Sequence, residues 1–247
     1  MIKTVNLTKK FGEVIAVNNL NLEVKKGELF VFLGPNGAGK TTTIKLITGL
    51  LKPTFGEIYI GGFSVQKEYK KVKSIIGYIP DSPFLYEKLT GREFLEFILD
   101  IYDMSEKKKK IDYYLEIFDL KGMEDRLIEE YSHGMRQKLA FASAMIHEPQ
   151  LLVIDEPMVG LDPKSARLIK ELLRKKTKEG VTVFLSTHTL PVAEELADRI
   201  GIIDEGRLIS IGTFEELKKL AKVEGSLEDV FLKLTEENES IPTNLEI

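Results

Sequence analysis

The chain has 247 residues, of which 43% are hydrophobic and 30% charged, and its net charge is −4. This length suits one large domain with an inserted subdomain, and it is sufficient to bury a sizeable core. The slightly acidic balance provides no overall basic field to attract nucleic acid or anionic lipid, so no nucleic-acid partner is expected. Because the chain has no cysteine, disulfides, thiolate chemistry and cysteine zinc sites are excluded.

The N-terminal segment lacks the apolar stretch of a secretory signal. Apolar runs such as 29–33 and 139–146 are far shorter than the about 20 residues needed to cross a bilayer. We therefore expect a soluble, cytoplasmic protein that reaches a membrane only through a partner.

Two kinds of strand pattern follow one another along the chain. Alternating apolar residues predict half-buried antiparallel strands at 2–7, 20–24 and 57–60. Continuous apolar runs predict strands covered on both faces, at 29–33, 151–155 and 182–186, and residues 75–79 and 199–203 are expected to join them. Helical patterns lie between these runs, which favours an α/β fold with a mostly parallel sheet and right-handed crossovers.

Residues from about 82 to 148 interrupt this alternation with apolar residues three and four apart, which predicts an inserted helical subdomain. Within it, the lysine run 107–110 is interpreted as a solvated helix face. Two short amphipathic helices and a polar tail are expected after about residue 213. The predicted division is a nucleotide-binding domain at 1–222 and a C-terminal helical extension with a polar tail at 223–247.

A phosphate-binding loop is the strongest motif. Residues 34–41 read GPNGAGKT, which fits GxxxxGK[ST], and they lie between a buried strand pattern and a helical one, the context that this motif requires. Such a loop turns backbone N–H groups around phosphate oxygens at the positive end of a helix. Lys40 is expected to reach the β- and γ-phosphates of ATP, and the Thr41 hydroxyl to bind Mg²⁺. The predicted cradle comprises Gly34, Pro35, Asn36, Gly37, Ala38, Gly39, Lys40, Thr41 and Thr42.

Two carboxylates and a histidine follow buried strands. LLVIDEP, at 151–157, brings Asp155 to a strand end, where it is the expected second Mg²⁺ ligand. Glu156 comes next and is expected to deprotonate the attacking water. His188 follows the run 182–186 and is assigned to the same catalytic edge, since ligands of open α/β sheets bind at the carboxyl ends of the strands.

The order of these elements resembles that of the ABC ATPase family over nearly the whole chain. YSHGM, at 131–135, is similar to the family signature LSGGQ and lies about twenty residues before Asp155. Taken alone, it is an ordinary serine N-cap. The resemblance implies that Ser132, His133, Gly134 and Met135 contact the γ-phosphate of ATP bound by the opposite subunit. It thus implies a head-to-tail dimer with two ATP molecules between the subunits. His133 and Met135 replace the usual Gly and Gln.

The resemblance also assigns three further positions. Phe11 matches the aromatic that stacks on adenine, although a core aromatic is the simpler alternative. Residues 159–162 resemble the loop that contacts the other subunit, and its Asp162 also has the pattern of a helix start. Asp81 occupies the place of the usual glutamine, where it can face Mg²⁺ and water as part of the catalytic set, but it offers no amide donor.

The segments 76–97 and 226–234 look like the branch of the family that contains drug, antibiotic and sodium exporters. This implies an ATPase that powers an exporter, bound to the inner face of the cell membrane through an integral-membrane permease. A second nucleotide-binding subunit, identical or different, would complete it. The alternative is a soluble ABC ATPase acting on the ribosome, DNA or cluster assembly, but the second cassette, coiled-coil or zinc insertions typical of those proteins do not occur here. A P-loop kinase or GTPase is disfavoured, because the sequence shows neither an NKxD motif nor an evident acceptor site.

Overall fold

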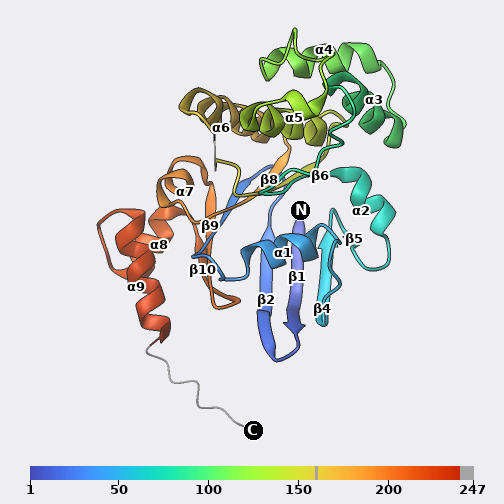
Figure 1. Cartoon of the computed structure of the whole chain (residues 1–247). Helices are drawn as coiled ribbons and strands as arrows, with labels where there is room; N and C mark the ends of the chain where they lie inside the picture. Colours follow the sequence, from blue (N-terminus) through green and yellow to red (C-terminus); the bar gives the residue numbers. More distant parts are fainter. Residues whose placement is uncertain (159–160, 240–247) are drawn as a thin grey trace.

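Two β-sheets and several packed helices make up the described part of the chain, residues 1–158 and 161–239, in this computed structural model (Figure 1). The first sheet is antiparallel, has the order β2-β1-β4-β5, and pairs β1 with both β2 and β4. Its strands are β1 (Ile2–Phe11), β2 (Val14–Val24), β4 (Phe55–Ile60) and β5 (Phe63–Ser64). Alternating residues of these strands are buried, as predicted for a sheet with one covered face.

The second sheet has the order β10-β9-β3-β8-β7-β6, and only β10 is antiparallel to its neighbour. Its strands are β3 (Leu29–Leu33), β6 (Ile76–Ile79), β7 (Leu151–Asp155), β8 (Thr182–Thr187), β9 (Arg199–Asp204) and β10 (Arg207–Gly212). Every residue of β3, β7 and β8 is buried, because this sheet is covered on both faces. The predicted α/β fold with a mostly parallel sheet and an antiparallel N-terminal sheet is confirmed.

One core cluster fills the space between the two sheets. Inner-face residues of the antiparallel sheet, such as Leu22 and Ile58, pack there with Phe30, Phe32 and Ile44. Phe30 and Phe32 project from β3 towards this side, and both rings contact the ring of Phe184 on the neighbouring strand β8. The antiparallel sheet is thereby held against the strand that leads into the phosphate-binding loop.

The helices complete the layers around the parallel sheet. They are α1 (Lys40–Ile47), α2 (Tyr69–Ile75), α3 (Gly91–Ile101), α4 (Lys107–Ile117), the short 3-10 helix η1 (Ile128–Glu130), α5 (His133–Met145), α6 (Pro163–Lys178), α7 (Leu190–Leu196), α8 (Phe214–Ala221) and α9 (Leu227–Glu239). Between β6 and β7 the chain, described throughout this stretch, forms helices and no strand, as predicted. Figure 1 shows α3, α4 and α5 grouped at one end of the molecule, far from the antiparallel hairpins.

The helical group is joined by an ion-pair network. Arg92 on α3 contacts Asp112 on α4 and the carboxylates of Glu124 and Asp125 in the following loop. The helix itself begins with a capping box, in which the Thr90 side chain and the third residue of the helix bond to each other's backbone. The capping box thus determines where α3 begins, and Arg92 connects the helix to α4 and to the loop after it.

Several elements were not predicted from the sequence, among them the short β5 and η1 as well as α2 and β10. α2 buries a single residue, Val72, so it has too weak an apolar face to show a helical period. β10 continues the sheet beyond β9 through a tight turn at Gly206, and most of its side chains are only partly buried. The predicted division at residue 222 stays a prediction, although Leu227 and Val230 of α9 enter the same core cluster as the parallel sheet.

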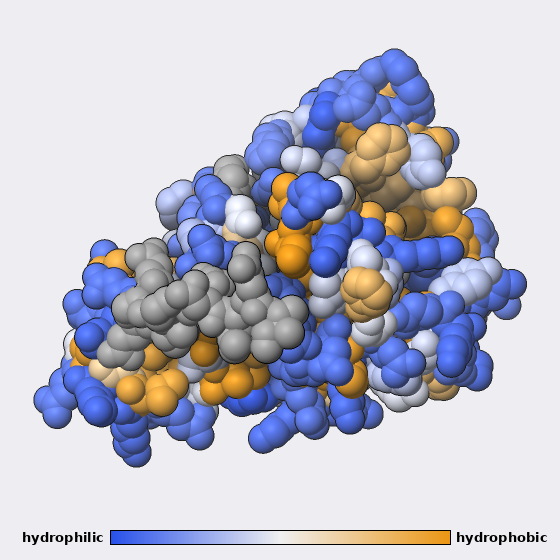
Figure 2. Space-filling view, turned by 90° about the horizontal axis from the view of Figure 1, so that it is seen from below, coloured by the Kyte–Doolittle hydropathy of each residue, from blue (hydrophilic) through white to orange (hydrophobic). Residues whose placement is uncertain are grey.

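Within residues 1–158 and 161–239, no helix combines the length and the apolar character needed to cross a membrane. The face seen from below is largely hydrophilic, with its hydrophobic residues in separate groups (Figure 2).

His147 joins the end of α5 to the beginning of β6. Its ring is only 7% exposed and stacks on Tyr102, with ring centroids 3.8 Å apart. Nε2 lies 3.0 Å from the carbonyl oxygen of Ile76, whereas Nδ1 meets no polar partner among the described residues. Burial lowers the pKa of His147, and the interactions with the backbone of Ile76 and of Ser143 oppose this shift only in part.

We predict that His147 makes the fold less stable in mild acid. The unfolded chain takes up its proton near the ordinary pKa of 6.5, whereas the folded chain binds it only at lower pH. The free energy of unfolding should therefore fall as the pH drops through about 6.5. His147→Gln keeps an amide donor for Ile76 and should flatten this part of the melting-temperature profile. His133→Gln, at an exposed position, is the matched control; identical profiles for His147→Gln and wild type would contradict the prediction.

Candidate nucleotide-binding and catalytic site

The loop between β3 and α1 encloses the Lys40 ammonium group. Nζ donates hydrogen bonds to the carbonyl oxygens of Gly34, at 2.8 Å, and Pro35, at 3.0 Å, and the side chain is only 6% exposed. The N-cap of α1 is Gly39, which has no side chain to occupy the first N–H groups of the helix. A cation and unoccupied helical donors therefore face the same loop, which suits it to bind an anion.

Two glycines of the loop are required by close backbone contacts. A Cβ atom at Gly34 would lie 2.3 Å from the carbonyl oxygen of Ile203. At Gly39 it would lie 2.4 Å from the carbonyl oxygen of Ala16, and the φ of +99° also favours glycine. The other strands of the fold therefore pass too near the loop for a side chain at either position.

The turn between β9 and β10 contacts the loop from outside the motif. The Gly206 N–H donates to the carbonyl oxygen of Ala38 at 3.0 Å, while its own carbonyl oxygen accepts from the Asn18 N–H at 2.8 Å. Gly206 thus connects the phosphate-binding loop to β2. Sequence reasoning missed this residue, and a glycine in a turn gives no signal that it contacts a loop so far away in the chain.

Three parallel strands bring the predicted catalytic residues together. Glu156, directly after β7, places Oε1 3.5 Å from Lys40 Nζ and 2.9 Å from Nδ1 of His188. Lys40 follows β3 and His188 follows β8, the strand between β3 and β7. Only 13% of the Glu156 side chain is exposed, so its charge is removed from water and placed beside a cation.

Asp155 lies at the same edge and is almost fully buried, with 1% exposure. Its Oδ1 accepts a hydrogen bond of 2.5 Å from the hydroxyl of Ser186 on β8. Sequence reasoning named the neighbouring His188 but missed Ser186. The available signal was weak: Ser186 is one of three hydroxyl residues on β8, and only the strand pairing shows that it is level with Asp155.

Asp81 is exposed and lies two residues beyond the end of β6, the neighbour of β7. Burial, followed by the negative charges of Asp155 and Asp81, raises the pKa of Tyr78 to about 12. The negative charges of both carboxylates therefore raise the pKa of the same phenol, which lies at this edge of the sheet. No hydrogen bond or ion pair connects Asp81 to Lys40 or Glu156 among the described residues, so its part in catalysis stays a prediction.

The signature-like segment begins α5. Ser132 is the N-cap, and its hydroxyl accepts a hydrogen bond of 3.3 Å from the Met135 N–H. Ser132 and His133 are exposed, and a Cβ atom at Gly134 would meet nothing within 4 Å. Within the described chain no contact joins this segment to Lys40, so one subunit does not bring the two together.

Phe11 ends β1 and pairs with Val14 in the first hairpin. Its side chain is 49% exposed and contacts the Lys9 ammonium, 5.0 Å from the ring centroid, so the alternative of a core aromatic is wrong. The second strand of this hairpin continues to Ala16, whose carbonyl oxygen approaches Gly39. An exposed ring on an element that contacts the phosphate-binding loop is available to a bound base.

Asp162 caps α6. Its carboxylate accepts hydrogen bonds from the Lys164 and Ser165 N–H groups and from the Ser165 hydroxyl, which together hold its pKa below the ordinary value. The predicted helix start is confirmed, while the predicted contact with another subunit stays untested. Val159 and Gly160, assigned to the same loop, lie outside the described residues.

The residues present fit ATP with Mg²⁺. Among the described residues, no group of three or more His, Asp or Glu side chains could hold a metal alone. Mg²⁺ does not need such a group, because it is commonly bound by one or two protein oxygens together with substrate phosphates and water. The buried Asp155 carboxylate and the exposed Thr41 hydroxyl at the start of α1 are oxygen donors of this kind, and their roles as Mg²⁺ ligands stay predictions.

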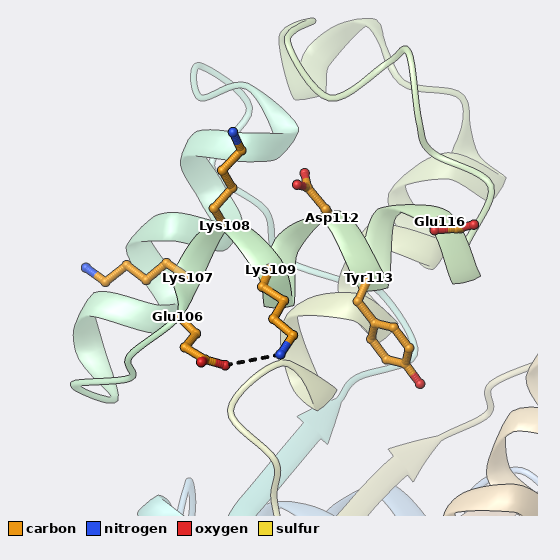
Figure 3. Close-up of a pocket in the computed structure, with 7 residues that line it drawn as sticks. All are labelled: Glu106, Lys107, Lys108, Lys109, Asp112, Tyr113 and Glu116. Carbon is orange, nitrogen blue, oxygen red and sulfur yellow. Dashed lines mark ion pairs between the residues drawn. The ribbon is translucent and has the colours of Figure 1, made fainter.

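A hollow on the outer face of α4 is separate from this site (Figure 3). Lys107 forms an ion pair with Asp100, Lys109 with Glu106 and Lys110 with Glu148. Three of the four lysines in the run are thus paired with carboxylates. Lys108 and Lys109 are exposed, as the interpretation of a solvated helix face requires, whereas Lys107 and Lys110 are half-buried.

The family model described as ABC transporter matches residues 17–159. This span contains the phosphate-binding loop, YSHGM and the Asp155–Glu156 pair. The chain belongs to the ABC transporter family. Its membership of this family, together with the catalytic edge described above, makes it an ABC-type ATPase.

Similar proteins support the membership of the ABC transporter family over most of the chain. The bacitracin transport ATP-binding protein BcrA of Bacillus licheniformis is 43% identical over 220 residues, which cover 89% of this chain and 72% of that protein. A solved structure of an ATP-binding subunit of an ABC transporter superposes with a TM-score of 0.91 at 32% identity, over 95% of this chain and 99% of the other. The dimeric post-hydrolysis structure of the cassette MJ0796 with ADP and Pi superposes with a TM-score of 0.79 at 31% identity. The match covers 86% of this chain and 98% of that one. The predicted resemblance to the antibiotic-related branch is confirmed.

We predict that Glu156→Gln lowers kcat for ATP hydrolysis by about 100-fold or more, because an amide cannot accept the proton of water. ATP binding should persist, since Lys40 and the loop are unchanged. Glu148→Gln is the matched control, because Glu148 is exposed and also has a left-handed backbone, with φ of +56° against +48° at Glu156. Steady-state phosphate release from both variants checks this; normal turnover by Glu156→Gln would show that the base lies elsewhere.

Proposed function

We propose that this chain is the nucleotide-binding subunit of a membrane exporter and works as a head-to-tail dimer. The carrying observation is that Lys40, Glu156 and His188 meet at one edge, while Ser132 and its neighbours lie outside that group. A second subunit could bring its own α5 N-terminus to the ATP bound here. The dimeric MJ0796 cassette, which superposes well on this chain, supports such an assembly.

In the proposed reaction, Lys40 and the loop N–H groups bind the phosphates and offset their charge. Glu156 accepts a proton from the attacking water. His188 orients the Glu156 carboxylate through Nδ1, which must carry the hydrogen because a carboxylate only accepts. In the neutral ring Nε2 is then an acceptor, and it would donate to a phosphate oxygen only if the ring carried a second proton. When bound through Asp155 and Thr41, Mg²⁺ would polarise the phosphate oxygens. Phe11 would stack on the adenine.

Dimerisation and hydrolysis together would move the two subunits towards and away from each other. With ATP bound, the Ser132–Met135 segment of one subunit would contact the γ-phosphate held by the other, and cleavage of that phosphate would remove the contact. Ser132 and Gly134 supply the exposed hydroxyl-capped helix start for this contact, while His133 and Met135 border it.

The surface for the permease is proposed to be the aromatic patch, defined as Phe84, Tyr86, Phe97 and Ile101. These side chains are exposed by 86%, 51%, 40% and 61% respectively. The Tyr86 ring contacts those of Phe84 and Phe97 edge-on, with centroids 6.2 Å and 5.5 Å apart. Exposed aromatics gathered in this way are typical of protein interfaces.

The aromatic patch is close in sequence to the catalytic edge. Asp81 follows β6 at that edge, and Phe84 comes three residues later. Ion pairs between Glu87 and Arg136 and between Lys88 and Glu129 connect the same segment to residues beside the signature. A change at the site or at α5 could therefore move the aromatic patch and, through it, a permease at the inner face of the membrane.

We predict that the double variant Phe84→Ser with Ile101→Ser loses its membrane partner but keeps ATP hydrolysis by the isolated subunit. Both side chains are exposed, so the fold should tolerate the change. The measurement is co-purification with an integral-membrane protein from detergent-solubilised membranes, followed by identification of its spans. Phe55→Ser is the matched control, because Phe55 is 63% exposed on the antiparallel sheet. Retention of the partner by the double variant would refute this surface, and recovery of the wild type with ribosomes would favour the soluble alternative.

A further inference from the structure

Ser186 lies where the strands of the catalytic edge converge. β8 runs between β3 and β7, and Ser186 is level with Phe32 on one side and Asp155 on the other. Phe32 is two residues before the phosphate-binding loop begins at Gly34. Ser186 is therefore at the end of the central strand, between the loop that holds Lys40 and the strand that carries the two carboxylates.

The Ser186 side chain is fully buried, so its hydroxyl must find hydrogen-bond partners inside the protein. It donates a hydrogen bond to Asp155 Oδ1 at 2.5 Å. The Glu156 N–H approaches the same hydroxyl oxygen at 3.4 Å and the Ser186 carbonyl oxygen at 3.2 Å. One residue thus contacts the side chain of Asp155 and the backbone of Glu156.

The backbone of Glu156 needs such a contact. Its φ of +48° is left-handed, a conformation that non-glycine residues adopt only when their surroundings enforce it. This turn directs the carboxylate towards Lys40 and His188 instead of along the strand. The Ser186 contacts hold the N–H group at the turn, so they help to set the direction of the Glu156 side chain.

Thr187, the next residue along β8, makes different contacts. The Thr187 carbonyl oxygen accepts from the Gly34 N–H at 3.3 Å, and its hydroxyl accepts from the Thr189 N–H at 3.0 Å. Thr187 therefore contacts the phosphate-binding loop and the turn into α7. Of these two residues, Ser186 is the one that contacts Asp155 and Glu156 at the end of β7.

We infer that Ser186 is a positioning residue for ATP hydrolysis, which orients Asp155 for the bound metal and Glu156 for the attacking water. This inference rests on the roles proposed above for the two carboxylates. The hydroxyl does not touch the substrate; it acts by fixing both groups at once. Without it, Asp155 loses its donor and Glu156 loses one of the two oxygens near its N–H.

The test compares Ser186→Ala with Ser186→Thr, which keeps the hydroxyl, and with Thr182→Ala. Thr182 is the matched control, because it is a fully buried hydroxyl at the opposite end of β8, where it accepts from the Gly27 N–H at 2.9 Å. Each full-length variant is assayed for kcat and for the KM of ATP. The affinity for a fluorescent ATP analogue is measured with Mg²⁺ and with EDTA, a readout that does not depend on turnover.

Ser186→Ala should lower kcat by about 10- to 100-fold, the usual effect of removing a residue that orients a metal ligand, with a much smaller change in KM. The gain in affinity that Mg²⁺ gives should shrink, while the affinity in EDTA stays at the wild-type value. Ser186→Thr should lie nearer to wild type than Ser186→Ala in both measurements. Thr182→Ala should retain the wild-type kcat and the full effect of Mg²⁺.

The inference is overturned if Ser186→Ala keeps the wild-type kcat and Mg²⁺ effect, if Ser186→Thr is no better than Ser186→Ala, or if Thr182→Ala loses as much as Ser186→Ala. If Ser186→Ala does not fold, Ser186→Cys takes its place under the same criteria, because a thiol is a weak donor of similar size. Asp155→Asn and Glu156→Gln are measured in parallel. If these keep turnover, the proposed roles of the carboxylates fail; if they lose it and Ser186→Ala does not, only the present inference fails.

Discussion

The structure of the site depends on the carboxylate of Glu156, which is largely shielded from water and contacts two partners. Glu156 is largely withdrawn from water, and a charge in that position is tolerated only beside a counter-charge and hydrogen-bond donors. Lys40 and His188 are those partners; Lys40 begins α1 after β3, and His188 directly follows β8. The left-handed turn at Glu156 costs about 1 to 2 kcal/mol. The strand order β3-β8-β7 is the arrangement that lets all three side chains meet.

The antiparallel sheet and the helical group lie on different sides of that edge (Figure 1). The antiparallel sheet packs against β3 through Phe30 and Phe32, and its first hairpin leaves Phe11 exposed. The helical group lies at the other end of the molecule, where α5 joins the sheet through His147. Since α5 has 13 residues, its signature end is about 20 Å from that joint. The helix is thus long enough to present Ser132 to another subunit while its other end contacts β6.

Much of this could be predicted from local patterns. The loop at 34–41 and the strand before it have short-range signals, since glycine spacing and continuous apolar runs reflect backbone and burial requirements at the same positions. The meeting of Lys40, Glu156 and His188 followed from the rule that parallel strands end at one edge. Ser186 was missed, because a single serine at a strand end does not reveal which neighbour it faces until the strand order is known. The exposure of Phe11 likewise depends on tertiary packing. Among the described residues no hydrogen bond or ion pair joins the signature segment to Lys40, Glu156 or His188, so local patterns in one chain do not reveal what it meets.

The contact between Gly206 and the phosphate-binding loop also has a consequence for the order in which the protein is made. The motif itself is finished early in translation, at residue 41, and its flanking strand and helix follow at once. The backbone group that connects Ala38 to Asn18 is added more than 160 residues later. A nascent chain halted after β8 would therefore carry the complete nucleotide-binding sequence without the turn that supports it. Nucleotide binding should then mature late on the ribosome, after β9 and β10 have joined the sheet.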